Sequence, residues 1–128
     1  AEVVSRSDAG FVIQRTVEVP AGASRVWHEL VRPSVWWNGV HTFSGDAANL
    51  SLDLRPGGCF CERLPAVRGT PGRGAGAVEH LRVVHFAPGK LLRLSGGLGP
   101  LQSEGLSGAL TFTLTEKHAT TEIKLTYV

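Results

Sequence analysis

The sequence has 128 residues, of which 42% are hydrophobic and 19% charged, and 13 Lys and Arg against 11 Asp and Glu leave a formal net charge of +2. This composition excludes fibrous, collagen-like and wholly disordered chains, and we expect residues 1–128 to form a single domain. The small, evenly spread charge predicts no nucleic-acid partner. No apolar run approaches the roughly 20 residues that a membrane-spanning helix needs, so no span is predicted.

The first predicted element is a strand over residues 11–19, followed by a helix. Apolar side chains alternate with polar ones along this strand, and Arg15 interrupts its apolar side. After the Pro20-Ala21-Gly22 stop, four apolar residues fall on one helical face until Pro33 ends the helix: Val26, Trp27, Leu30 and Val31. Pro33 can itself begin a second short helical turn that carries Trp36 and Trp37.

The rest of the chain predicts β-strands. Residues 50–54 and 59–64 read as a hairpin around a turn at residues 55–58, and further strands are predicted at 77–86, 91–95, 110–114 and 123–127. Gly69 to Gly76 is rich in glycine, but it lacks the Gly-Lys-Ser/Thr ending of a phosphate loop and leads into a strand, so we interpret it as a hairpin connection. The fold class is therefore α+β, with about seven antiparallel strands and two short helices after the first strand.

The predicted helices are too short for the predicted sheet. Seven strands about 4.8 Å apart make a sheet more than about 30 Å wide, whereas a helix of about ten residues is about 15 Å long. The sheet must therefore curl strongly, pair with a second copy of the chain as a homodimer, or be covered by a further helix. We favour a C-terminal helix that would follow Val128 and is absent from this sequence.

This succession of elements resembles the helix-grip fold of the START and Bet v-type superfamily, also called SRPBCC. The resemblance rests on Val19-Pro20-Ala21 leading into residues 24–27, on Trp36-Trp37, on Pro56-Gly57-Gly58-Cys59-Phe60, and on the strand through Val83 that precedes Pro88-Gly89. The Pro-Gly-Gly hairpin is similar to that of the branch that contains the activator of the heat-shock-protein ATPase (AHSA-like) and polyketide cyclase proteins. In this family, the resemblance implies, a curved sheet wraps a C-terminal helix and encloses a cavity for an apolar small molecule.

The two cysteines, Cys59 and Cys61, are expected to be free thiols packed as small apolar groups. Within a strand their side chains share a face about 6.5–7 Å apart, which is the outer limit for a disulfide. A zinc site would need two further ligands, and His80 and His85 point to opposite sides of one strand, so neither a metal nor a cofactor is predicted.

Glu62 is the most interesting carboxylate, because it lies between Phe60 and Leu64 in the alternating pattern. If these three residues face a cavity, desolvation raises the pKa of Glu62, and the group can act as a general acid or base. If the inner face is instead that of Cys59, Cys61 and Arg63, Glu62 lies in solvent.

Other polar residues interrupt apolar strand faces. His80 is a candidate ligand-facing proton shuttle, although a strand histidine is more often a packed group with one hydrogen bond. Arg15 and Arg93 can pair with Glu62 or hold an anionic head group, or simply extend to water at the sheet edge. Among the aromatic residues, we expect Trp36, Trp37, Phe60 and Phe112 to line the cavity, with at least one tryptophan packed in the core.

The function that these patterns favour is the binding of a small apolar molecule between the curved sheet and its helices. One alternative is a polyketide cyclase or dehydratase-like enzyme that uses Glu62 with His80 or an arginine. Another is a protein-interaction module of the chaperone-regulator kind, which predicts an exposed apolar patch. The sequence lacks Met and starts with Ala1, as after cleavage of a secretory signal, yet it favours an exported and a cytoplasmic location equally.

Overall fold

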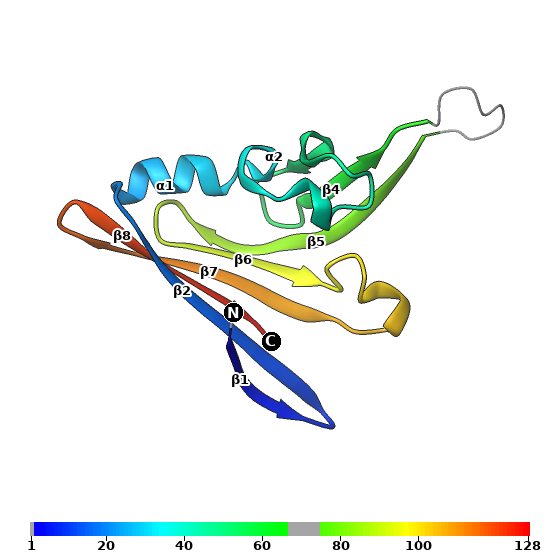
Figure 1. Ribbon diagram of the computed structural model, residues 1–128, viewed down its shortest axis with the longest axis horizontal. Coiled ribbons are helices and arrows are strands. Elements are labelled where there is room, and N and C mark those ends of the chain that lie inside the picture. Colours follow the sequence, from blue (N-terminus) through cyan, green and yellow to red (C-terminus); the bar gives the residue numbers. More distant parts are fainter. Residues whose placement is uncertain (1, 67–74) are drawn as a thin grey trace.

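The computed structural model describes residues 2–66 and 75–128 (Figure 1). It contains one antiparallel sheet with the strand order β1-β2-β8-β7-β6-β5-β4-β3. The strands are β1 (Glu2–Ser7), β2 (Gly10–Val19), β3 (Leu50–Leu52), β4 (Cys59–Leu64), β5 (Gly76–Ala87), β6 (Leu91–Gly96), β7 (Gly108–Lys117) and β8 (Thr120–Tyr127). Helices α1 (Ala23–Leu30) and α2 (Pro33–Trp36) connect β2 to the far edge of the sheet.

The α+β fold class and the helix-grip-like architecture are confirmed. Each strand predicted from alternation is present, and the sheet has eight strands rather than about seven. The additional strand is β1, which pairs only with β2 and has every residue exposed. It could not be recognised from the sequence because a strand without a buried face needs no apolar alternation.

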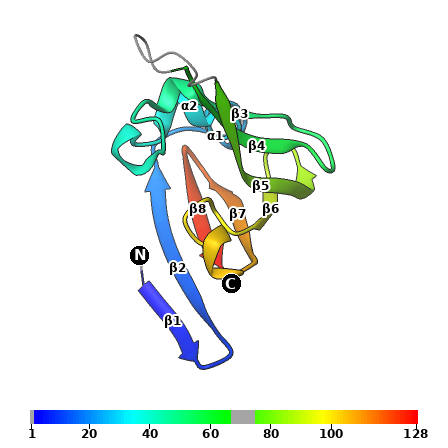
Figure 2. The ribbon, with the colours of Figure 1, turned by 90° about the vertical axis from the view of Figure 1, so that its right-hand side faces the viewer.

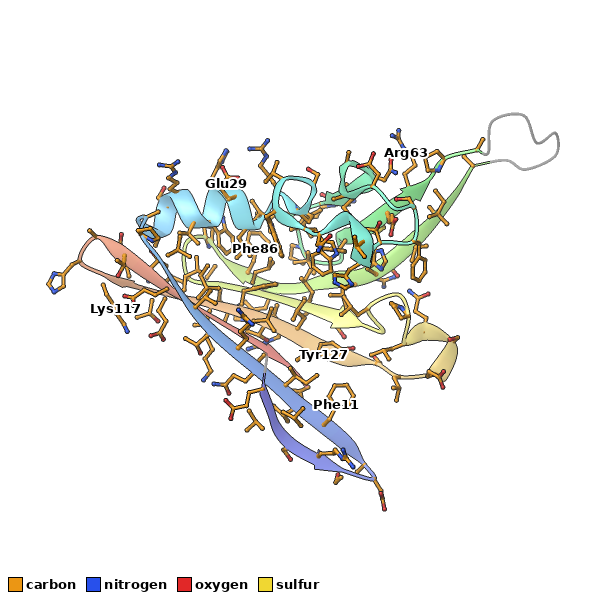
Figure 3. All side chains as sticks on the ribbon, viewed as in Figure 1. Phe11, Glu29, Arg63, Phe86, Lys117 and Tyr127 are labelled. Carbon is orange, nitrogen blue, oxygen red and sulfur yellow. A yellow bond between two sulfur atoms is a disulfide. The ribbon has the colours of Figure 1, made fainter. Side chains whose placement is uncertain are left out.

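The sheet curls strongly, and both helices lie along one of its faces (Figures 1 and 2). The hydrophobic core fills the space between them: Val26 and Leu30 of α1 pack with buried side chains of the central strands, among them Leu81, Leu92 and Phe112. Figure 3 shows Phe86 beneath α1, whereas Phe11 and Tyr127 lie on a part of the sheet away from the helices. Strong curvature was one of the three expected solutions to the coverage problem, while the homodimer and a helix after Val128 stay predictions.

Helix α1 is anchored to the sheet by side chains of the β7–β8 hairpin rather than by its own cap. Gly22 precedes the helix and provides no side-chain cap. Glu116 of β7 accepts a hydrogen bond from the backbone N–H of Ala23 at 3.2 Å, and the Thr121 hydroxyl of β8 donates to the carbonyl of Ala21 at 2.7 Å. The carboxylate at the helix N-terminus satisfies a free N–H and complements the helix dipole.

Most of the glycine-rich connection, residues 67–74, lies outside the described residues. Among the helices that the structure describes, none combines the length and the apolar character needed to cross a membrane.

Candidate functional site

A buried carboxylate and a buried imidazole form a pair on the inner face of the sheet. Glu62 of β4 is fully buried and His80 of β5 is 7% exposed. His80 Nε2 lies 2.8 Å from Glu62 Oε1. The backbone N–H groups of Phe43 and Ser44 donate to the two carboxylate oxygens at 3.1 and 2.5 Å. The arrangement in which Glu62 lies in solvent is therefore excluded.

A β-bulge in β5 turns His80 inward. In the pairing of β5 with β4, Phe60 lies opposite Leu81 and Cys61 lies opposite Glu79, which leaves His80 as the additional residue between them. A bulge interrupts the alternation of a strand and can redirect a side chain. His80 and Leu81 are consequently neighbours in sequence and both buried.

The bulge also explains why apolar and polar residues do not separate onto two faces in the sequence of β5. A second register shift falls between Val83 and His85 in the pairing of β5 with β6, so the alternation reverses once more. Val83 is 1% exposed, whereas Val84 is 50% exposed. A strict two-residue period therefore cannot be fitted along the whole of β5, although every segment between the shifts obeys it.

The hydrogen bonds around Glu62 reverse the expected direction of its pKa shift. Burial raises the pKa of Glu62, but hydrogen bonds from Ser44, from His80 and from the Phe43 backbone outweigh burial and lower the pKa from 4.5 to about 2. The expectation of a raised pKa is wrong because it considered desolvation without the donors of the loop. At neutral pH Glu62 is a carboxylate, which only accepts hydrogen bonds.

Sequence reasoning missed Phe43 and Ser44, the donors to this carboxylate. Both act through backbone N–H groups, and every non-proline residue has one, so no residue type marks them. The loop path is set by Thr42, whose hydroxyl donates to the Gly39 carbonyl at 2.6 Å and accepts from the Gly45 N–H at 2.9 Å. The Thr42 contacts therefore shape the loop that presents the two N–H groups to Glu62.

His80 forms part of the wall of an apolar hollow, which we call the His80 pocket. Its volume is about 330 Å³, and its lining includes Trp37, Phe43, Leu50, Phe60 and Leu98. The rings of Phe43 and Phe60 each meet the His80 ring edge to face, with centroids 5.6 Å apart. His80 also borders a neighbouring hollow of about 470 Å³ that includes Glu79 and Gln102. The imidazole is thus held between two aromatic rings, with Nε2 fixed on Glu62.

A second apolar hollow, the Trp36 groove, lies on the other side of the tryptophan pair. It has a volume of about 580 Å³, and Trp36, Phe112, Ile123 and Leu125 are among its lining residues, together with Arg15. Trp36 and Trp37 are in contact at 5.3 Å between ring centroids, so the two adjacent tryptophans line different hollows. Their indole N–H groups donate to the Leu30 and His41 carbonyls.

The structure does not bring Arg93 to either hollow. Its neighbours Leu92 and Leu94 are buried in the core, so Arg93 lies on the opposite face of β6, where its Nε donates to the Thr111 hydroxyl at 3.0 Å. Three predicted site residues line the His80 pocket, namely Trp37, Phe60 and His80. Glu62 is hydrogen-bonded to His80, and Trp36 and Phe112 line the Trp36 groove.

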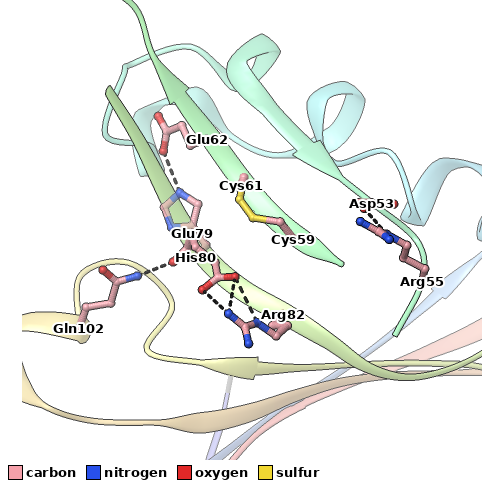
Figure 4. Close-up of a disulfide and its surroundings, with 9 residues drawn as sticks. All are labelled: Asp53, Arg55, Cys59, Cys61, Glu62, Glu79, His80, Arg82 and Gln102. Carbon is pink, nitrogen blue, oxygen red and sulfur yellow. Dashed lines mark hydrogen bonds and ion pairs between the residues drawn. A yellow bond between two sulfur atoms is a disulfide. The ribbon is translucent and has the colours of Figure 1, made fainter. Parts of the chain in front are cut away.

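Cys59 and Cys61 form a disulfide on the outer face of β4 (Figure 4). Their Cα atoms are 5.4 Å apart, which is well within the range of disulfides. The expectation of free thiols is wrong because it used the regular strand spacing of about 6.5–7 Å.

Comparison with known proteins finds solved structures of similar fold. No family model matches the chain. No curated protein matches it either. Protein NE0264 from Nitrosomonas europaea superimposes with a TM-score of 0.61 at 16% identity, over 91% of this chain and 73% of that one. CalU16 from Micromonospora echinospora gives 0.55 at 18% identity, over 98% and 68%. The protein of gene BPP1335 from Bordetella parapertussis gives 0.58 at 20% identity, over 97% and 63%. At these identities the similarity shows the fold alone.

Proposed function

We propose that this protein binds a small, mainly apolar molecule in the His80 pocket. The observation that carries the proposal is a concave apolar wall of Trp37, Leu50 and Phe60 into which one buried polar pair, His80 and Glu62, is built. Small-molecule sites are typically apolar hollows of about 300–1,000 Å³ with a few well-placed polar groups. The fold shared with NE0264 and CalU16 is compatible with such a cavity.

The polar pair indicates what the ligand carries. Because Glu62 is a carboxylate, His80 Nε2 must bear the proton that it donates, which makes Nδ1 of a neutral imidazole a hydrogen-bond acceptor. The ligand class is therefore an apolar ring system with a hydroxyl group that donates to His80.

Binding of 2-naphthol and of naphthalene, measured by equilibrium dialysis, tests this proposal. We expect 2-naphthol to bind about fivefold more tightly, since one neutral hydrogen bond contributes about 1 kcal/mol. His80→Gln keeps a donor for Glu62 and should remove the preference for the hydroxyl. Absence of saturable binding by both probes would refute the proposal.

Two tryptophan variants form a matched pair that locates the ligand. Trp37→Leu removes a wall of the His80 pocket, whereas Trp36→Leu changes the groove on the other side of the pair. We expect Trp37→Leu to weaken 2-naphthol binding at least about tenfold, as the loss of a large aromatic contact does, and Trp36→Leu to weaken it little. The opposite order would place the ligand in the Trp36 groove.

The hydrogen-bonded pair of Glu62 and His80 also favours proton transfer as a second candidate function. A histidine oriented by a buried carboxylate is a general base, and here the Nε2–Oε1 distance of 2.8 Å fixes the tautomer that leaves Nδ1 as the base. The probe is 2-tetralone, whose proton next to the carbonyl would pass to Nδ1 and be replaced by deuterium in D2O. Faster deuteration with the protein, lost in His80→Gln, would support an enzyme; binding without exchange would support a carrier.

A further inference from the structure

The Cys59–Cys61 disulfide lies apart from both apolar hollows, on the outer face of the sheet. Both cysteines are partly exposed, while Phe60 between them is 4% exposed and points inward. The disulfide is therefore partly accessible at the outer surface of the sheet and lies outside the core. This accessibility distinguishes the bond from disulfides that are packed in a protein interior.

The disulfide and the fold stabilise each other only weakly. A disulfide stabilises a fold mainly by restricting the unfolded chain, and its effect grows with the number of residues in the loop. Here the two cysteines are separated by only two positions in the sequence. β4 is also held by its backbone pairing with β3 and β5, so the strand stays in the sheet when the bond opens.

Two ion pairs flank the two cysteines, and the charges within each pair compensate each other. Glu79 and Arg82 of β5 lie opposite the two cysteines and pair with each other at 3.2 Å, so their charges compensate (Figure 4). After β3, Asp53 and Arg55 compensate each other in the same way at 2.6 Å.

Among the described residues, Arg63 is the remaining charged neighbour, and it lies two residues after Cys61 on the same face of β4. Its guanidinium donates to the neutral Asn49 side chain, and it forms no ion pair in the described part of the chain. Within the described part of the chain, one uncompensated positive charge is therefore left beside the disulfide. Positive charge beside a cysteine stabilises its thiolate form and attracts an anionic reactant.

We propose that Cys59–Cys61 is a thiol–disulfide exchange site for small anionic thiols, with Arg63 as the group that favours their approach. A thiolate attacks one cysteine sulfur, the S–S bond breaks, and its electron pair leaves on the other sulfur as a thiolate. A second thiol then attacks the mixed disulfide. Two molecules of the thiol are oxidised to their disulfide, and the two cysteines are reduced to thiols. This proposal is independent of ligand binding in the His80 pocket.

Reduced glutathione, an anionic thiol, is the probe for the test. The oxidised full chain is incubated with it at low ionic strength, quenched with N-ethylmaleimide and measured by intact mass, with far-UV circular dichroism to show that the fold persists. We expect two alkylated cysteines, with the glutathione adduct as an intermediate. If only a phosphine reductant opens the bond in the folded protein, the disulfide is structural and the proposal fails.

A charge-matched pair of variants tests the role of Arg63. Arg63→Gln should slow reduction by glutathione about threefold or more at low ionic strength, and the difference should vanish at high salt. Arg6→Gln removes the same charge from exposed β1, at the opposite edge of the sheet, and should not change the rate. Equal rates for the two variants would overturn the assignment of Arg63.

A single-cysteine variant tests the exchange step without relying on reduction. Cys59→Ser leaves Cys61 beside Arg63, and with oxidised glutathione it should form a stable mixed disulfide that peptide mapping places on Cys61. Cysteamine, a cationic thiol, is the probe of opposite charge. Because Arg63 repels this thiol, Arg63→Gln should accelerate its reaction with the Cys59–Cys61 disulfide. Failure of Cys61 to form an adduct while the protein is folded would contradict an exchange site.

Discussion

At the scale of single residues, the charge state of Glu62 is decided by its hydrogen-bond partners. The side chain is fully buried, yet donors from His80, Phe43 and Ser44 lower its pKa to about 2. A carboxylate that accepts several hydrogen bonds can keep its charge in a site where burial alone would neutralise it. Glu62 is therefore a structural anion that fixes the loop around Phe43 and orients the His80 ring.

The pH dependence of stability should report this anion. Because the folded-state pKa is below the ordinary value of 4.5, ionised Glu62 stabilises the fold above pH 4.5, and the stabilisation is lost as the pH falls from 4.5 to about 2. Glu62→Gln should lower the free energy of unfolding at pH 7 by about 3 kcal/mol. Urea unfolding at pH 7 and at pH 3 measures the difference, which should shrink at the lower pH.

The control for this prediction is Glu79→Gln, which changes an exposed carboxylate on the other face of the sheet. Its ion pair with Arg82 is between exposed side chains, and such pairs contribute about 0–1 kcal/mol. Parallel pH profiles for wild type and Glu62→Gln would show that Glu62 does not stabilise the fold as an anion.

At the scale of elements, the β3–β4 turn shows how local sequence and close packing combine. Gly57 has φ +78, a conformation that favours glycine, and nothing lies within 4 Å of the position of its missing Cβ. Gly58 has an ordinary φ, but a Cβ atom there would lie 1.9 Å from the Asp53 carbonyl oxygen. The first glycine is therefore required by backbone conformation and the second by the approach of another segment.

Alanine at Gly58 should therefore destabilise the protein strongly. The contact is with backbone, so the turn must move, and we expect Gly58→Ala to lower the free energy of unfolding by about 2 kcal/mol or more. Gly10→Ala is the matched control, because nothing lies within 4 Å of its Cβ position. Equal melting curves for the two variants would contradict the close approach at Gly58.

At the scale of the whole molecule, stability should differ between the two edges and the centre of the sheet. The central strands contribute the most deeply buried side chains: Leu81, Val83, Leu92 and Leu94 are each 1% exposed. By contrast, β1 pairs with β2 alone, and all its residues are exposed. Opening β1 thus exposes little apolar surface.

Amide hydrogen exchange tests this difference strand by strand. We expect the amides that bond within β5, β6 and β7 to exchange slowest, near the limit of global unfolding, and those of β1 to exchange fastest among the strands. Mass spectrometry of peptic fragments measures both in one experiment. Protection of β1 equal to that of β6 would indicate that a further surface covers this edge, as the predicted homodimer could.

The sequence by itself determined the elements whose signals are local. Alternation located the strands from β2 to β8, apolar spacing located α1, and Pro and Gly marked their ends, because these patterns depend only on neighbours along the chain. Phe60, Glu62 and His80 could be named as candidates for the same reason.

Only the tertiary structure decided how those residues act. The bulge that turns His80 inward and the donors that keep Glu62 ionised each depend on a neighbouring strand or loop. Register and desolvation are properties of contacts between segments far apart in sequence, so a pattern along one segment cannot contain them.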